Sequence, residues 1–372
     1  MNLSNRIERI EESGIRKVFE LAVKNKGELI NLSIGQPHFP APKILKQKAQ
    51  EAIENNFNAY LPTMGLPALR EKIVEKLKIQ NEIEAELEQV IITTGVAGGV
   101  FLALSAVINP GDEVILPDPY FVLYKQVLNY LGAKIVYLDT YPDFDLSPEK
   151  LAQLVTKKTK LIIINSPNNP TGKVYSKETL EKVVKIARKN KLIILSDEIY
   201  EIFDYENKFF SVGSIYEKTI TLNGFSKSHS VTGWRVGFAQ GPCEIIEAMN
   251  KLQQHTFVCA PSFAQQALAD GFDIDLNEAP EYYKKNRDYL CKNLEKYYDF
   301  EKSEGAFYLF LKKPLGVENF NQKLIDNGLL TISGEVFSER ADYFRLSFAV
   351  EFDKIKKGVE ILKNKNISKN EN

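Results

Sequence analysis

The chain has 372 residues, of which 44% are hydrophobic and 26% charged, with a formal net charge of -1 at pH 7. This is the mix of an ordinary globular protein, and the length favours two domains. The charge argues against general binding to nucleic acid or to a membrane surface. The three cysteines and three histidines are widely spaced, which predicts no disulfide framework and no metal site. With no signal-like apolar core and no membrane-spanning run, we expect a cytoplasmic protein.

The first 80 residues mix helices with loops. Apolar residues at helical spacing predict a helix over 1–28, and a short strand is predicted over 29–35. The next segment, GQPHFPAP, has three prolines and cannot hold regular structure, and its Gly35 can bring backbone close to a ligand. Two amphipathic helices are predicted over 43–55 and 66–78, with Tyr60 on the loop between them.

From Val90 onward, short apolar strands alternate with helices. The strands are predicted at VIITTG, EVILPDPYF, KIVYLDT, KLIIINSP, KLIILSDEIY and TITLNGFSK. This pattern indicates an α/β fold with a mostly parallel, mixed sheet covered by helices on both faces. After about Gly271, helices mixed with short strands indicate a smaller α+β domain. We therefore predict a large domain over 41–275 and a small domain made of 1–40 and 276–372.

Ligands of such a sheet collect at the carboxyl ends of its strands, and distinctive residues lie there. Gly95, Val96 and Ala97 start a helix, where free N–H groups favour a phosphate, although close helix–strand packing explains the glycines equally well. In NSPNNPTGKVY, the side-chain amide of Asn169, held by the rigid Pro170, would be a fixed hydrogen-bond donor. A plain turn does not explain the repeated asparagines.

Charged residues follow the later strands. Asp197 and Tyr200 belong to SDEIY, where a buried carboxylate needs a cation such as a protonated cofactor ring nitrogen, unless it caps a helix. Lys227 follows TITLNGFS. Desolvation there would make its amine a nucleophile able to form a Schiff base, but the local sequence alone fits a surface charge better. Arg235 is a cation suited to phosphate, and Arg345, in the apolar run YFRLSFA, needs a carboxylate from the protein or from a substrate.

The motifs NPTG, SDEIY, SK with an arginine eight residues later, and FRLSFA occur in this order. In this respect the chain resembles the fold-type I pyridoxal-phosphate aminotransferases of class I, closest to the bacterial aspartate/aromatic branch. The resemblance runs from SIGQPHF to FRLSFA, nearly the whole chain. It implies a homodimer with sites at the subunit interface, using pyridoxal 5'-phosphate to transfer an amino group between an L-amino acid and a 2-oxo acid such as 2-oxoglutarate.

The resemblance also implies roles for the matching residues. Lys227 would bind the cofactor covalently and move protons, and Asp197 would pair with the ring nitrogen. Asn169 and Tyr200 would contact the phenolate oxygen of the cofactor, and Phe121 would contact the face of its ring. The phosphate would be bound by Gly95, Val96, Ala97, Ser226, Arg235 and a second subunit's Tyr60. Arg345, Gly35 and Asn169 would bind the substrate carboxylate. The Asn169–Pro170 bond is expected to be cis.

Two positions depart from the family pattern. Gly224 stands where a serine often contacts the phosphate, so Ser226 or Ser228 would compensate. Ala97 stands where aspartate-using members carry a lysine for the distal substrate carboxylate, a contact worth about 1.5–3 kcal/mol.

The residues expected near Ala97 are aromatic: Phe39, Phe121, Tyr124 and Phe225. We therefore expect a neutral or aromatic amino donor, unless an arginine such as Arg16 replaces the missing charge. The alternatives are an aspartate aminotransferase and a C–S β-lyase of the same fold. A DNA-binding regulator would need an added domain and a basic charge.

Overall fold

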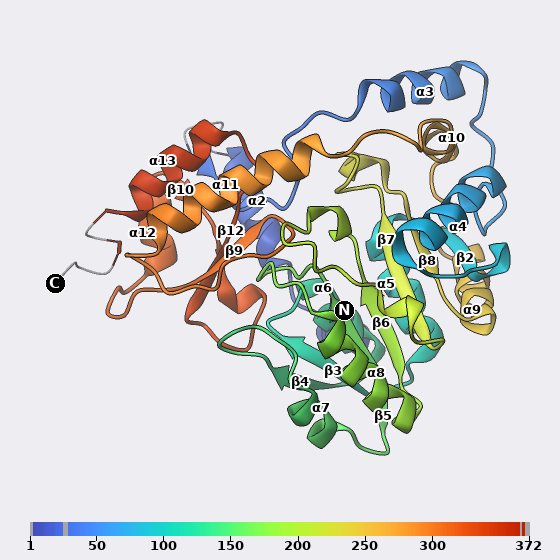
Figure 1. Cartoon of the computed structure of the whole chain (residues 1–372), viewed down its shortest axis with the longest axis horizontal. Helices are drawn as coiled ribbons and strands as arrows, with labels where there is room; N and C mark the ends of the chain where they lie inside the picture. Colours follow the sequence, from blue (N-terminus) through green and yellow to red (C-terminus); the bar gives the residue numbers. More distant parts are fainter. Residues whose placement is uncertain (1–2, 25–28, 365–366, 369–372) are drawn as a thin grey trace.

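This computed structural model describes residues 3–24, 29–364 and 367–368. A seven-stranded sheet lies at the centre of its larger part (Figure 1). Its strands are β2 Val90–Thr93, β3 Glu113–Asp118, β4 Lys134–Asp139, β5 Thr159–Asn165, β6 Ile193–Asp197, β7 Thr219–Gly224 and β8 Gly237–Gln240. They are hydrogen-bonded in the order β2-β8-β7-β6-β5-β3-β4. Strand β8 runs antiparallel to β2 and β7, and the other pairs are parallel. The predicted mostly parallel, mixed sheet is confirmed.

Helices cover both faces of this sheet. One face packs against α5 Gly95–Val107, α6 Val122–Leu131 and α9 Cys243–Gln254, and the other against α7 Pro148–Leu154 and α8 Lys177–Asn190. Three more helices, α3 Lys43–Glu54, α4 Pro67–Asn81 and α10 Ser262–Asp270, gather beside β2 (Figure 1). Successive side chains of a strand point to opposite faces, so in β6 Leu195 joins the first core and Ile194 the second. Among the described helices, none is long and apolar enough to cross a bilayer.

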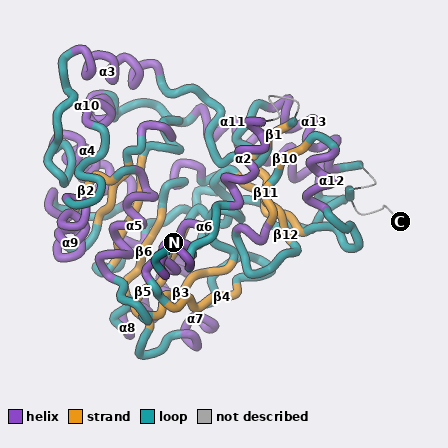
Figure 2. Tube along the Cα trace, turned by 180° about the vertical axis from the view of Figure 1, so that it is seen from behind, coloured by secondary structure: helices purple, strands orange, loops and turns teal. Residues whose placement is uncertain are grey.

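The C-terminal part forms a smaller α+β region with the N-terminal segment. Strands β9 Tyr308–Lys312, β11 Ile332–Ser333 and β12 Tyr343–Ser347 form an antiparallel sheet, and β1 Ile30–Asn31 pairs in parallel with β10 Leu329–Leu330. The helices of this region are α2 Gly14–Lys24, α11 Glu278–Leu294, α12 Phe320–Asp326 and α13 Phe352–Leu362, whereas α1 Asn5–Glu8 lies against α6 of the large sheet. Figure 2 shows α2 and β1 beside the C-terminal strands. The domain boundaries at 40/41 and 275/276 stay predictions.

The N-terminal segment is less regular than the sequence suggested. Instead of one helix over 1–28 there are two, because Ser13 caps α2 by accepting the N–H of Arg16 at 3.3 Å, and the N–H of Glu11 donates to Gln126 of α6 at 2.9 Å. Residues 1–2 and 25–28 lie outside the described part, so this comparison holds for residues 3–24. The strand predicted over 29–35 is reduced to β1, since the side chain of Asn31 takes the N–H of Ser33 at 3.0 Å and turns the chain away from strand pairing.

Candidate active site

A cavity of about 610 Å³ lies at the carboxyl ends of β5, β6 and β7, bounded by the start of α5, by β9 and β12, and by the N-terminal segment. The predicted site residues that line it are Gly35, Val96, Ala97, Phe121, Asn169, Asp197, Tyr200, Ser226, Lys227, Arg235 and Arg345. Gly95 lies beside it, against Arg235. Tyr60 does not line it, and its side chain is 86% exposed. The fold thus gathers residues from distant parts of the chain around one cavity.

Lys227 follows β7 and lies in the cavity wall, so it is not a surface charge. Its Nζ donates to the carbonyl oxygen of Gly35 at 2.6 Å. The pKa of Lys227 is lowered to about 8, chiefly by burial and also by the positive charges of Arg345 and Arg235, against an opposing effect of Asp197. A large part of this amine is therefore uncharged at mildly alkaline pH, as a nucleophile requires.

Asp197, the last residue of β6, is a buried carboxylate facing the cavity. Its Oδ2 accepts from the hydroxyl of Tyr124 at 2.7 Å, and its Oδ1 accepts from the N–H of Ile199 at 3.2 Å. Burial raises the pKa of Asp197 to about 6, and these two hydrogen bonds act against the rise. No lysine or arginine within the described ranges forms an ion pair with it. The bond to Ile199 is local, but it caps no regular helix, so a cationic ring nitrogen would satisfy this carboxylate.

Asn169 lies on the loop after β5. Its N–H donates to the side chain of Asn165 at 2.9 Å, and Asn165 in turn donates to the carbonyl oxygen of Asp197 at 3.0 Å. The prediction of a cis bond at Asn169–Pro170 is wrong: in this loop the cis bond is Ser166–Pro167. The stretch around Pro170 closes instead as a single turn, in which the N–H of Gly172 donates to the carbonyl oxygen of Asn168 at 2.9 Å.

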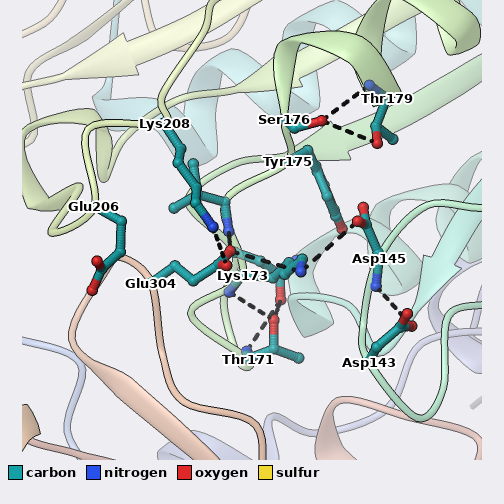
Figure 3. A network of polar contacts seen from close by, with 12 residues as sticks. Asp143, Asp145, Thr171, Lys173, Tyr175, Ser176, Thr179, Glu206, Lys208 and Glu304 are labelled. Carbon is teal, nitrogen blue, oxygen red and sulfur yellow. Dashed lines mark hydrogen bonds and ion pairs between the residues drawn. The ribbon is translucent and has the colours of Figure 1, made fainter.

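The same loop is fixed to the chain that precedes β9. Lys173 lies 3.8 Å from the carboxylates of both Asp145 and Glu304, and Lys208 lies 2.7 Å from Glu304 (Figure 3). The carbonyl oxygen of Gly172 accepts the N–H groups of Glu304 at 2.9 Å and of Gly305 at 2.7 Å. This network ties the loop that carries Asn169 to the C-terminal region.

Arg345, in the middle of β12, is 1% exposed. Its Nη1 donates to Oδ1 of Asn169 at 2.8 Å and its Nη2 to the carbonyl oxygen of Ser33 at 2.7 Å, while its Nε has no hydrogen-bond partner among the described residues. The rings of Tyr308 and Phe337 lie 4.4 and 4.5 Å from the guanidinium. No carboxylate within the described ranges pairs with Arg345. The sequence left two possible partners for Arg345, a carboxylate of the protein or one of a substrate. The described residues supply no protein carboxylate, so the arrangement fits a substrate carboxylate.

The start of α5 and Arg235 form a cradle whose groups are suited to an anion. A Cβ on Gly95, whose φ is +66°, would lie 2.6 Å from Nη2 of Arg235, so glycine allows this arginine to lie across the helix start. The N–H groups of the first turn are free to bind an anion. With a lysine of lowered pKa and a buried carboxylate in the same cavity, this arrangement fits a phosphorylated cofactor that has a basic ring nitrogen.

Close packing also explains Gly224. A Cβ at this position would lie 2.8 Å from the Cα of Gly237 in β8, so β7 and β8 leave no room for the expected serine. Of its two suggested substitutes, Ser226 lines the cavity and Ser228 does not. The hydroxyl of Ser228 instead bonds Nδ1 of His229 at 2.7 Å.

Sequence reasoning missed several cavity residues and misplaced others. It did not foresee Tyr124 as the partner of Asp197, nor Tyr308, whose hydroxyl bonds that of Tyr200 at 2.8 Å. Phe39 and Phe225 do not line the cavity, because they pack in two separate hydrophobic cores. Nor does Arg16 line it: its exposed side chain lies 3.8 Å from Glu20.

Comparisons with known proteins show the family of the chain. Residues 27–362 match the family model described as aminotransferase class I and II. A probable aspartate aminotransferase of Methanocaldococcus jannaschii is 37% identical, over 97% of this chain and 99% of that protein. An aromatic-amino-acid aminotransferase of Thermococcus litoralis is 36% identical, over 97% of each chain.

Solved structures give the same result. The aspartate aminotransferase of Thermus thermophilus with maleate superposes with a TM-score of 0.92 at 32% identity, covering 97% of this chain and 99% of that chain. The similar proteins are archaeal as well as bacterial, so the likeness is wider than the bacterial branch that the motifs suggested. The chain belongs to the class I and II aminotransferase family.

Proposed function

We propose that this aminotransferase moves an amino group from an L-amino acid with a neutral or aromatic side chain to a 2-oxo acid such as 2-oxoglutarate. The family depends on pyridoxal phosphate, which, when bound, supplies an electron sink for the bonds at the substrate Cα. One observation supports the proposal most: a lysine with lowered pKa and a buried, unpaired carboxylate face the same cavity, beside an anion-binding helix start.

The chain's own residues would hold the cofactor as follows. Lys227 would bind it covalently and Asp197 would pair with the ring nitrogen. The phenolate oxygen would be bound by Tyr200 and by the Nδ2 group of Asn169, whose oxygen is already used by Arg345. Phe121 would contact the face of the ring. The phosphate would be bound by Gly95, Val96, Ala97, Ser226 and Arg235.

Substrate binding and proton transfer would use the same residues. Arg345 would bind the α-carboxylate as a two-pronged donor, with the backbone of Gly35 and the side chain of Asn169 beside it. The uncharged amine of Lys227 would take the proton from the substrate Cα and would then give it to the carbon of the cofactor to which the amino group is bound. Its position next to the carbonyl oxygen of Gly35, at 2.6 Å, places this base close to the proposed carboxylate site.

The charges of the cavity support a neutral or aromatic donor. Its lining cations within the described ranges are Lys227, Arg235 and Arg345, and each of them already has a proposed role. The remaining wall combines apolar residues (Ile15, Ile34, Val122, Leu123 and Ile199) with uncharged polar ones (Ser13, Gln36, Gln126, Asn165 and Thr232) and the acidic Glu11. A second substrate carboxylate would therefore meet no further cation. The same reasoning applies to the acceptor, so pyruvate should be compared with 2-oxoglutarate.

We further propose a homodimer in which Tyr60 joins the phosphate site of the other subunit. Tyr60 lies on the loop between α3 and α4 and is 86% exposed, so its ring is free to contact a partner subunit. A cytoplasmic location is proposed because Cys243, Cys259 and Cys291 are free thiols. Light scattering and a Tyr60→Phe variant that loses cofactor affinity would test the dimer.

Absorption spectra and a substrate panel test the function. The purified protein should show the visible band of a lysine-bound cofactor, and Lys227→Ala should lose it. With 2-oxoglutarate or pyruvate as acceptor, aromatic and neutral amino acids should react faster than aspartate. A strong preference for aspartate would favour the aspartate alternative. Steady release of pyruvate and ammonia without an acceptor would favour the β-lyase alternative, and absence of the band would refute the proposal.

A further inference from the structure

A buried polar cluster lies behind Asp197, outside the cavity. It joins Lys76 and Asn81, at the end of α4, to Glu198 and Glu201 of the turn that follows β6. None of the four lines the cavity, so the proposed chemistry does not use them. Their burial nevertheless demands a reason, because buried charges are costly unless they are well paired.

Asn81 is the centre of this cluster. Its Nδ2 donates to Glu201 at 2.9 Å and approaches Glu198 at 3.4 Å, and its Oδ1 accepts from Nζ of Lys76 at 2.7 Å. Lys76 also forms an ion pair with Glu201, in which the two side chains are only 11% and 12% exposed. One amide and one lysine thus hold the carboxyl groups of Glu198 and Glu201 together.

Glu198 is 1% exposed and is fixed from a second side. Its carboxylate accepts from the hydroxyls of Ser196 and Ser211, both at 2.8 Å. Burial and, to a smaller degree, the nearby charge of Glu201 together raise the pKa of Glu198 to about 8, against the hydrogen bonds from Ser196 and Ser211. An apolar set of similar size would stabilise the fold at least as well, so stability alone does not account for this arrangement.

The position of Glu198 in the chain connects the cluster to the cavity. Neighbouring side chains of an extended strand point to opposite faces, so Glu198 turns away from the cavity where Asp197 turns toward it. The N–H of Glu198 donates to the carbonyl oxygen of Leu222 at 2.9 Å, and the N–H of Glu201 donates to that of Glu198 at 3.0 Å. Holding the Glu198 side chain from behind therefore limits rotation of the turn that carries Asp197 and Tyr200.

We propose that Lys76, Asn81, Glu198 and Glu201 are positioning residues that fix the direction in which the Asp197 carboxylate faces the cofactor. The proposal rests on the proposed function, since it gives Asp197 the ring nitrogen as its partner. It assigns to helix α4, which contributes nothing to the cavity wall, the role of a rear support for the site.

The test uses the cofactor-loaded enzyme with Asn81→Ala and Lys76→Met. Both should lower kcat by about 10- to 100-fold with little change in KM. They should also move the pH midpoint of the visible band, because the charge of Asp197 would no longer sit at a fixed distance from the bound ring. The band midpoint is a property of the site's charges that a change in overall stability does not alter.

Two variants of the same helix serve as controls. Lys78→Met removes an exposed pair with Glu84 at 3.1 Å, and Ile73→Val removes a methyl group from the buried face of α4. Ile73→Val should lower the Tm and leave the band midpoint and kcat unchanged. Lys78→Met should leave the Tm, the band midpoint and kcat unchanged.

Each outcome decides the question. A wild-type band midpoint in Asn81→Ala and Lys76→Met, or a shift of equal size in Ile73→Val, would overturn the positioning role. If the wild-type enzyme shows no band and no transamination, the proposed function fails first. If it shows both and the cluster variants match it, only the present inference fails.

Discussion

The guanidinium of Arg345 donates to the side-chain oxygen of Asn169 at 2.8 Å, joining β12 to the loop after β5 across 176 positions of sequence. Both side chains are buried and both face the cavity. The bond fixes the rotamer of Asn169, with its amide oxygen toward the arginine, and leaves its nitrogen as a donor. The proposed substrate site and the proposed cofactor site therefore share one hydrogen bond.

Arg345→Lys should lose substrate binding while keeping the cofactor. A lysine ammonium cannot keep the bonds to Asn169 and Ser33 and also bind a carboxylate with two parallel donors. We expect kcat/KM for the amino donor to fall by about 100-fold, equivalent to about 2.7 kcal/mol, with the visible band retained. Steady-state kinetics measure this. Arg340→Lys, at an exposed pair with Asp139, is the matched control and should leave kcat/KM unchanged.

The lowered pKa of Lys227 predicts how fast the cofactor-free protein captures pyridoxal phosphate. Only the uncharged amine reacts, and the pKa is about 8 instead of the ordinary 10.5, so the capture rate should rise with pH and level off above about 8. Arg345→Met should move this midpoint upward, because it removes a positive charge that favours the neutral amine. Stopped-flow absorbance measures the rate, and a wild-type midpoint near the ordinary lysine value would contradict the burial argument.

Gly224→Ser should destabilise the protein even though it restores a residue common in the family. Its Cβ would lie 2.8 Å from the Cα of Gly237 and 3.1 Å from the carbonyl oxygen of Val236, both backbone atoms that cannot rotate away. We expect a loss of about 1–3 kcal/mol in the free energy of unfolding, measured with urea. Gly233→Ser is the control, since no heavy atom of the described residues beyond its two chain neighbours lies within 4 Å of a Cβ built there.

Sequence alone predicted the residues that follow strands in a parallel sheet. Asp197 is the last residue of β6, and Lys227 follows β7, the neighbouring strand. Parallel strands bring their carboxyl ends to one edge of the sheet. It could not predict the direction of each side chain. Phe225, only two residues from Lys227, points into the core formed with α3, α4 and α10 instead of the cavity.

Contacts between distant segments were also beyond the sequence. Nothing near Tyr124 indicates that its hydroxyl reaches Asp197, 73 positions away. The break in the N-terminal helix depends partly on Gln126, which takes the N–H of Glu11 from 115 positions away. Such pairings depend on how the two regions pack, and local periodicity carries no information about that.

Glu198→Gln should make stability less dependent on pH. The folded protein holds the pKa of Glu198 at about 8, compared with an ordinary 4.5, so between these values the unfolded chain has lost a proton that the folded protein keeps. Stability contributed by this group therefore falls as the pH rises from about 4.5 to about 8, by up to about 1.4 kcal/mol per pH unit.

Glutamine removes that titration and keeps a similar shape, so its unfolding free energy should fall less over this range. Asp197 has a pKa raised in the same direction, but it is present in both proteins and cancels in the difference. Urea unfolding across the range measures the slopes, and Glu84→Gln at an exposed position should follow the wild type. Equal slopes in Glu198→Gln and the wild type would show that Glu198 is ionised in the fold.

Ala97→Lys should shift the amino-donor preference toward aspartate. Ala97 is exposed at the cavity wall in the first turn of α5, so a longer side chain can be accommodated there. A new cation facing the distal carboxylate is worth about 1.5–3 kcal/mol. The ratio of kcat/KM for aspartate to that for phenylalanine should therefore rise by about 10- to 100-fold.

Ala97→Met separates charge from size, since it adds a side chain of similar length without a charge and should leave that ratio at or below its wild-type value. If both variants raise the ratio equally, the shape of the cavity selects the donor. If neither does, the second carboxylate is bound elsewhere, and the missing charge at position 97 does not explain the preference.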